Sequence, residues 1–109
     1  MRKKLLIALA IACSAGAHAE FKDGNKLLSQ MQKEYAGNDW FNAIGYVTGV
    51  VDAHNGNLFC APATSTAAQL FDMTKQYLSE NPAVRHLPAD LLIAVALSKP
   101  WPCKKGSSS

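Results

Sequence analysis

The stretch GYVTGVVDAHNGNLFCAP, residues 45–62, decides which class of fold this sequence encodes. It places Gly45 and Gly49 four residues apart in an apolar run, and then an Asp, a His, an Asn-Gly step and Cys60 follow. Four interpretations compete: a phosphate-binding loop, a dimerisation face in a membrane, a metal site, and part of a small helical domain held by a disulfide. The rest of the chain distinguishes between them.

The first nineteen residues have the pattern of a secretory signal peptide. Three basic residues at 2–4 precede the apolar run LLIALAIA at 5–12, and small residues follow up to Ala19. We expect cleavage after Ala19, because the apolar run is shorter than the roughly 20 residues that span a bilayer. The alternative is a lipoprotein with Cys13 lipidated, although Ala10 stands where a branched apolar residue is usual. We therefore predict an exported protein without stable membrane insertion after cleavage.

Removal of this segment leaves a chain with no formal net charge. Three of the eleven Lys and Arg residues lie within residues 1–19, so eight remain against eight Asp and Glu. The net charge of +3 therefore belongs to the targeting segment. It indicates neither nucleic-acid binding nor attraction to an anionic membrane.

The mature chain is predicted to be one small domain, residues 20–103, with residues 104–109 as a flexible tail. A domain of about 90 residues buries only about 60–65% of its unfolded surface, so a covalent crosslink adds much to its stability. Cys60 and Cys103 remain after cleavage, and an even number of cysteines in an exported chain indicates a disulfide. A metal site is the alternative, but the chain has no Cys-x-x-Cys or His-x-x-x-His pair.

Apolar residues recur at helical spacing throughout the domain, which predicts an all-α fold, a small four-helix bundle. The first helix follows Asp23 as its N-cap, includes Tyr35 in its apolar stripe and ends near residues 36–38. The second helix begins at Asp39 and carries an apolar stripe and a stripe that contains both glycines. We expect close packing on both stripes, so this helix would lie at the centre of the bundle.

Two more helices follow the Asn-Gly turn. The third begins with a capping box from Thr66 to Gln69 and ends by Asn81, ahead of a proline. The fourth, residues 89–98, is apolar nearly all round and is expected to be the most buried. Trp101 lies between two prolines and is predicted to pack beside the cysteine pair.

The sequence shows no pattern typical of an enzyme. The glycines of residues 45–62 lie in a helical pattern without a preceding strand or a Lys-Ser/Thr ending, so a phosphate loop is disfavoured. Asp52 and His54 follow the apolar run directly, which disfavours a membrane face. Cys60 with a histidine would make a nucleophile and base, but an exported protein with one other cysteine normally oxidises both. We predict no catalytic residue, no cofactor and no metal ligand.

The end of the third helix, together with the loop that follows it, is the candidate binding site. It contains Glu80, Asn81, Arg85 and His86 between or beside two prolines. In one interpretation Arg85 caps carbonyl groups at the end of the third helix and His86 lies against the fourth. In the other, the loop projects polar side chains into a partner protein.

Several segments together resemble the Rap/Tai family of type VI secretion immunity proteins. The resemblance runs from Phe21 to Cys103 and is carried, in order, by FKDGNKLL, GYVTGVVDA, FCAP, a Thr-x-x-Gln-Leu helix start, QYLSENPAVRHLPADLLIAVAL and WPC. It implies an all-helical periplasmic protein, often a homodimer, that binds and blocks a peptidoglycan-cleaving amidase effector. Residues 81–87 are then expected to contribute to the contact, with Arg85 and His86 foremost.

The family pattern also bears on the disulfide. Members typically carry two further cysteines, one at the end of the first helix and one before the Gly-Tyr segment. This chain has neither, since the corresponding residues are Leu28-Ser29-Gln30-Met31 and Phe41-Asn42-Ala43. The resemblance therefore implies a bridge between Cys60 and Cys103.

Two other functions are compatible with a small exported helical domain. One is a general periplasmic binding module or acid-stress chaperone, which would bind many clients at low pH. The other is a prophage-borne inhibitor of a cell-wall hydrolase, which would share the scaffold.

Overall fold

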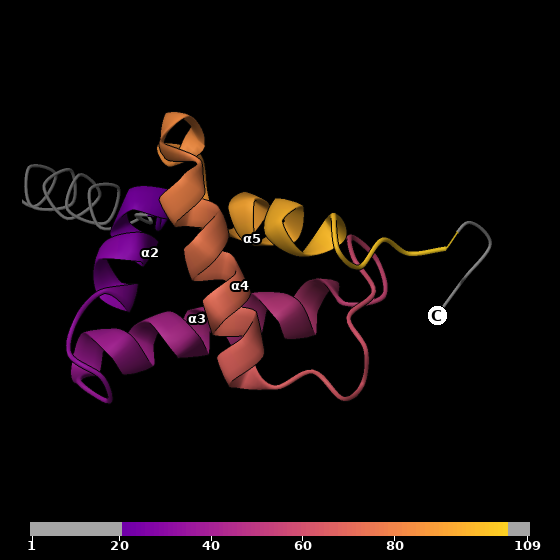
Figure 1. The fold of residues 1–109 in the computed structure, drawn as a ribbon, viewed down its shortest axis with the longest axis horizontal. Coiled ribbons are helices and arrows are strands. Elements are labelled where there is room, and N and C mark those ends of the chain that lie inside the picture. The colour runs from indigo at the N-terminus through magenta and orange to yellow at the C-terminus, as the bar shows by residue number, and fades with distance from the viewer. Residues whose placement is uncertain (1–20, 105–109) are drawn as a thin grey trace, which may run out of the picture.

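The computed structural model describes residues 21–104, and these fold into four α-helices and one short 3₁₀ helix (Figure 1). The elements are α2 Gly24–Met31, α3 Asn38–His54, α4 Ala67–Glu80, the 3₁₀ helix η1 Pro82–Val84, and α5 Ala89–Ser98. In Figure 1, α4 crosses α3, and the two helices pack against each other. The predicted all-α fold with four helices is confirmed. The expected signal peptide, Cys13 and all of the tail except Lys104 lie outside the described residues.

Two helices begin at the caps that the sequence predicts. The Oδ1 atom of Asp23 accepts a hydrogen bond of 2.8 Å from the Lys26 backbone N–H at the start of α2. At the start of α4, the Thr66 hydroxyl oxygen accepts one of 3.1 Å from the Gln69 backbone N–H. Each bond satisfies a backbone donor that has no partner within its own helix.

The first predicted helix ends earlier than the sequence pattern indicates. α2 stops at Met31, and Tyr35 lies in a tight turn with 79% of its surface exposed. The turn is closed by a 3.0 Å hydrogen bond from the Gly37 N–H to the Glu34 carbonyl, and Ala36 adopts a left-handed backbone with φ 63°. Gly37, and not the expected Asp39, occupies the N-cap position of α3. The chain must reverse here to bring α3 against α2, and this reversal ends the apolar periodicity.

Helix α3 is packed on one side and exposed on the other. Its buried residues are Ala43, Val47 and Val51, at a spacing of four. Gly45 and Gly49 are exposed, and a methyl group added at either would meet nothing within 4 Å. The expectation that the glycine stripe packs closely is therefore wrong. α2, α4 and α5 all contact α3, and its apolar face alone provides the contacts.

The core lies between the four helices. α5 contributes six buried residues, the most of any described helix, although Leu91 and Val95 on its outer face are exposed. The connector after α3 adds Phe59, which is fully buried. This connector turns at Gly56, whose φ of 91° favours glycine. The principal buried apolar side chains are Leu27, Met31, Val47, Phe59, Leu78, Leu92, Ile93 and Leu97.

A disulfide joins this connector to the C-terminal segment. Cys60 and Cys103 are bonded, with a Cα–Cα distance of 4.9 Å and a sequence separation of 43 residues. Closing a loop of that length stabilises the fold by about 4 kcal/mol in the chain-entropy model. The Cys60 N–H also donates a 2.8 Å hydrogen bond to the carbonyl of Trp101, which packs against the core. The predicted bridge and the predicted packing of Trp101 are both confirmed.

Candidate functional site

The segment from Glu80 to Leu87 forms a compact corner between α4 and α5. The Asn81 side-chain amide donates a 2.8 Å hydrogen bond to the Tyr77 carbonyl, which caps the end of α4. The 3₁₀ helix η1 follows, and the Leu87 N–H then donates to the Val84 carbonyl at 3.0 Å. Backbone bonds within the corner therefore define its shape.

The start of α2 is distant from this corner in the sequence but is hydrogen-bonded to it through the backbone. The Gly24 N–H donates to the Leu87 carbonyl at 3.1 Å, and the Asn25 N–H donates to the Arg85 carbonyl at 2.9 Å. The Ala89 N–H donates in turn to the Lys22 carbonyl at 2.9 Å. The free N–H groups of the first turn of α2 thus find their partners in the corner, and the corner is rigidly attached to the domain.

Arg85 faces inward and supports the end of α4. Its Nη1 donates a 3.2 Å hydrogen bond to the Leu78 carbonyl, and its Nε atom is buried without a hydrogen-bond partner among the described residues. This geometry matches the first of the two sequence interpretations of Arg85. The guanidinium therefore contributes to the shape of the corner.

The other three predicted binding residues differ in how exposed their side chains are. Glu80 and His86 are exposed, whereas Asn81 is half-buried and turned toward α4. Gln76 donates a 3.1 Å hydrogen bond to the Glu80 carboxylate, which orients that side chain along α4. All four predicted residues lie in one corner, where Glu80 and His86 are exposed and Asn81 and Arg85 are half-buried.

Lys22, near the start of the described residues, contacts two side chains of α3. The Lys22 ammonium lies 4.6 Å from the centre of the Tyr46 ring and donates a hydrogen bond to Asn42. Burial lowers the pKa of Lys22, and the neighbouring Lys26 ammonium lowers it further. Burial raises the pKa of Tyr46, and the Asp90 carboxylate adds to the increase. None of these contacts involves Glu80 or His86.

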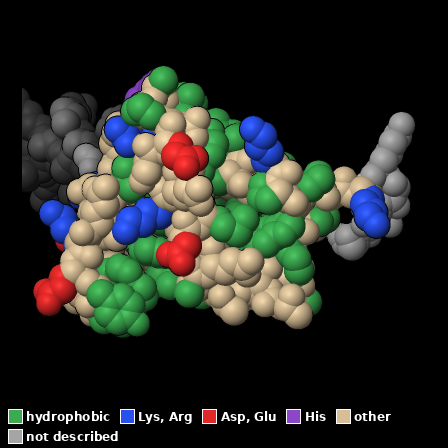
Figure 2. All heavy atoms as spheres, in the orientation of Figure 1, with side chains coloured by type: hydrophobic (Ala, Val, Ile, Leu, Met, Phe, Trp, Pro, Cys, Tyr) green, Lys and Arg blue, Asp and Glu red, His purple; other side chains and the backbone are tan. Residues whose placement is uncertain are grey.

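Two surface hollows lie along α4, one near each end. A groove of about 410 Å³ lies between α4 and α5, with Met73, Tyr77 and Val95 on its walls and Glu80 and Lys99 among its lining residues. Figure 2 shows hydrophobic side chains gathered between these helices. A second hollow of about 390 Å³ lies near the other end of α4, by the turn between α2 and α3.

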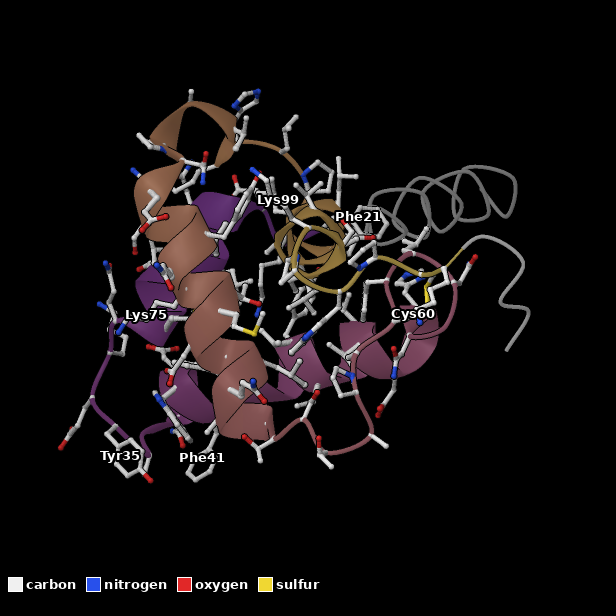
Figure 3. All side chains as sticks on the ribbon, turned by 45° about the vertical axis from the view of Figure 1, so that its right-hand side comes forward. Phe21, Tyr35, Phe41, Cys60, Lys75 and Lys99 are labelled. Carbon is white, nitrogen blue, oxygen red and sulfur yellow. A yellow bond between two sulfur atoms is a disulfide. The ribbon has the colours of Figure 1, made fainter. Side chains whose placement is uncertain are left out.

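The sequence interpretation missed the aromatic residues at this second hollow. Tyr35 and Trp40 line this hollow, and Phe41 lies next to Trp40. The Tyr35 and Trp40 rings are tilted by 58° with centres 4.7 Å apart, and Phe41 meets Trp40 edge-to-face at 5.2 Å. Figure 3 shows Tyr35 and Phe41 at the same end of the molecule. Periodicity assigned Tyr35 to a buried stripe. The run Gly37-Asn38-Asp39, which is typical of a turn, is the signal that could have placed this tyrosine on the surface.

The described part of the chain lacks the features of a metal site and of a membrane span. Within residues 21–104, no group of three or more His, Cys, Asp or Glu side chains is placed to hold a metal ion. None of the helices in that range combines the length and the apolar character needed to cross a membrane.

Comparison with known proteins assigns the chain to a family. The model of the family described as Rap1a immunity proteins matches residues 9–103, which is most of the 109 residues. No curated protein matches the chain. The matched range includes all four described helices, both bonded cysteines and the corner between α4 and α5. The chain therefore belongs to the Rap1a immunity protein family.

Proposed function

We propose that this immunity protein acts in the periplasm, where it binds and inhibits a peptidoglycan-cleaving amidase effector of a type VI secretion system. The producing cell and its siblings would thereby be protected. Family membership carries the proposal, because an immunity protein acts by binding an effector. The Cys60–Cys103 disulfide supports an oxidising compartment such as the periplasm, and so does the expected signal peptide at residues 1–19.

Inhibition of this kind needs no catalysis by the immunity protein. It requires a surface that covers the effector's catalytic cleft, and a surface that is already rigid loses little entropy on binding. The corner at residues 80–87 fits this requirement, since α2 holds its backbone through the Arg85 and Leu87 carbonyls. We assign the contact to the exposed Glu80 and His86, with Arg85 and Asn81 positioning them.

Rescue from lysis tests the proposal. A candidate amidase is expressed in the periplasm with and without the immunity protein, and lysis is followed by optical density. Glu80→Ala with His86→Ala is expected to weaken protection without loss of helicity, because both side chains are exposed. Thr64→Ala, an exposed change in the connector before α4, is the matched control.

The outcomes separate the competing functions. Lysis that proceeds equally with the wild-type protein would refute the amidase proposal. Binding to many unrelated clients at low pH would instead support a chaperone. Full protection by the Glu80/His86 double variant would remove the corner from the contact while leaving the function intact. Light scattering on the purified protein tests the homodimer that we propose together with this function.

A further inference from the structure

We propose that the aromatic group Tyr35, Trp40 and Phe41 is a second contact surface for the effector, and that it receives an apolar side chain flanked by carboxylates. We call this group, with Lys33 and Lys75 at its edge, the aromatic surface. The inference rests on the proposed function, because it names a further part of the surface that the same partner contacts. It uses residues outside the corner at 80–87.

The first observation is the exposure of large apolar side chains. Tyr35 is 79% exposed and Phe41 is 57% exposed, and the two lie close together at one end of the molecule (Figure 3). Leaving such rings in water costs free energy in proportion to their apolar area. Tyrosine and tryptophan are also enriched among the residues that dominate binding energy in protein interfaces. A partner that covers these rings therefore gains more than one that covers an average surface.

The second observation is that the rings are held in place before any partner arrives. The Tyr35 ring packs against Trp40 in a tilted arrangement with centres 4.7 Å apart. Trp40 in turn packs at 5.4 Å, also tilted, against Phe71, which is buried in the core. The turn that presents Tyr35 requires Ala36 to adopt φ 63°, a left-handed conformation that is unfavourable for alanine. The fold maintains this strained turn, and the result is a rigid aromatic platform that loses little conformational entropy on binding.

The third observation is the charge around the hollow beside the rings. Its volume is about 390 Å³, and Tyr35 and Trp40 line it. The charged residues that line it are Lys33, Lys75 and Asp72, which gives a net positive charge. Figure 3 places Lys75 on α4, on the same side of the molecule as Tyr35. An apolar platform beside two ammonium groups is complementary to a hydrophobic side chain with acidic neighbours.

The dimensions allow one partner to reach both surfaces. α4 has 14 residues, and at 1.5 Å per residue it is about 21 Å long. The corner follows its C-terminal end, and the hollow contains Ala68 and Phe71 near its N-terminal end. A standard interface buries about 800 Å² on each partner, which corresponds to a disc about 32 Å across. A single effector can thus contact both ends of α4.

Binding measurements with the purified amidase that this chain protects against in the lysis assay test the inference. Tyr35→Ala with Phe41→Ala is expected to weaken affinity at least about tenfold, mainly through faster dissociation. Phe21→Ala is the matched control, because Phe21 is also an exposed aromatic, at 87%, but lies outside the aromatic surface. Tyr35→Phe keeps the ring and is expected to bind like the wild type. Circular dichroism confirms that each variant is folded.

A charge reversal tests the acidic character of the partner. Lys33→Glu with Lys75→Glu is expected to slow association about tenfold and to weaken the dependence of association on salt, because long-range attraction acts on the encounter. Loss of affinity in this variant together with an unchanged salt dependence would contradict the predicted carboxylates.

The outcomes distinguish this inference from the proposed function. If the wild-type protein inhibits the amidase and the Tyr35/Phe41 double variant binds equally well, the aromatic surface is refuted and the proposed function stands. If the wild type does not bind the amidase, both fail. A change in tryptophan fluorescence on adding soluble muropeptides alone would make the hollow a saccharide site, and would overturn the inference.

Discussion

Replacement of single glycines by alanine is expected to have opposite effects in α2 and α3. At Gly45 and Gly49 an added methyl group meets nothing within 4 Å, and both residues lie in the interior of α3. Alanine is favoured over glycine there by about 1 kcal/mol, because it loses less backbone entropy on folding. Gly45→Ala with Gly49→Ala should therefore raise the free energy of unfolding by about 2 kcal/mol.

At Gly24 the same change should destabilise the protein. A methyl group built there lies 2.5 Å from the Leu92 Cδ1 atom and 2.8 Å from the Arg85 carbonyl oxygen. The leucine can move, but that carbonyl accepts the 2.9 Å hydrogen bond from the Asn25 N–H. Relief of the overlap must therefore displace the corner from α2. Overpacking of this kind costs about 1–3 kcal/mol.

Thermal unfolding followed by circular dichroism measures both effects. For a domain of this size, 1 kcal/mol shifts Tm by about 4–8 °C. The double variant at Gly45 and Gly49 should melt above the wild type, and Gly24→Ala should melt below it. A lower Tm for the Gly45/Gly49 variant would refute the reasoning, because it would show that the exposed glycine face of α3 is packed in solution. An unchanged Tm for Gly24→Ala would show that the contact between α2 and the corner can adjust without a measurable loss of stability.

Three more predictions concern the disulfide, the core and the pH dependence of stability. Cys60→Ala with Cys103→Ala should lower the free energy of unfolding by about 4 kcal/mol through the lost loop closure, measured by urea denaturation; an unchanged urea midpoint would contradict this. Phe59→Ala should cost about 3–5 kcal/mol, because the ring is fully buried; a loss below about 1 kcal/mol would show that the connector rearranges. Burial and the Asp90 carboxylate raise the pKa of Tyr46 above 10.0, so the folded protein keeps a phenol proton that the unfolded chain releases. The resulting stability is fully present below pH 10.0 and is lost as pH rises through the folded pKa. Urea midpoints at increasing alkaline pH should therefore fall more steeply for the wild type than for Tyr46→Phe, and parallel curves would exclude a contribution from this phenol.

Local signals predicted much of the fold correctly. The N-caps at Asp23 and Thr66 form as expected, because a cap depends on residues three positions apart in the chain. The stop at Gly56 and the break after α4 are equally local. The pairing of Cys60 with Cys103 followed from their number and from the family resemblance.

The failures have a common physical cause. Periodicity assigned Tyr35 to a buried stripe, but the chain reverses before that residue and the ring lies on the surface. Glycines four residues apart, such as Gly45 and Gly49, occur on helix faces that pack closely and on faces that are exposed, as these two are. Whether a glycine stripe meets a neighbour depends on where other helices lie, which the spacing does not contain.

The candidate site, too, was predicted only in part from the sequence. The sequence by itself indicated that residues 82–87 form a loop, and it left two roles open for Arg85. The tertiary structure shows the capping role, because the Leu78 carbonyl accepts a hydrogen bond from the Arg85 guanidinium and α2 binds the backbone of the corner. Helix caps, turns and the apolar pattern arise from neighbouring residues, so the sequence alone determined them. The exposure of Glu80, His86 and the aromatic surface depends on contacts between segments far apart in the chain, so only the tertiary structure decided it.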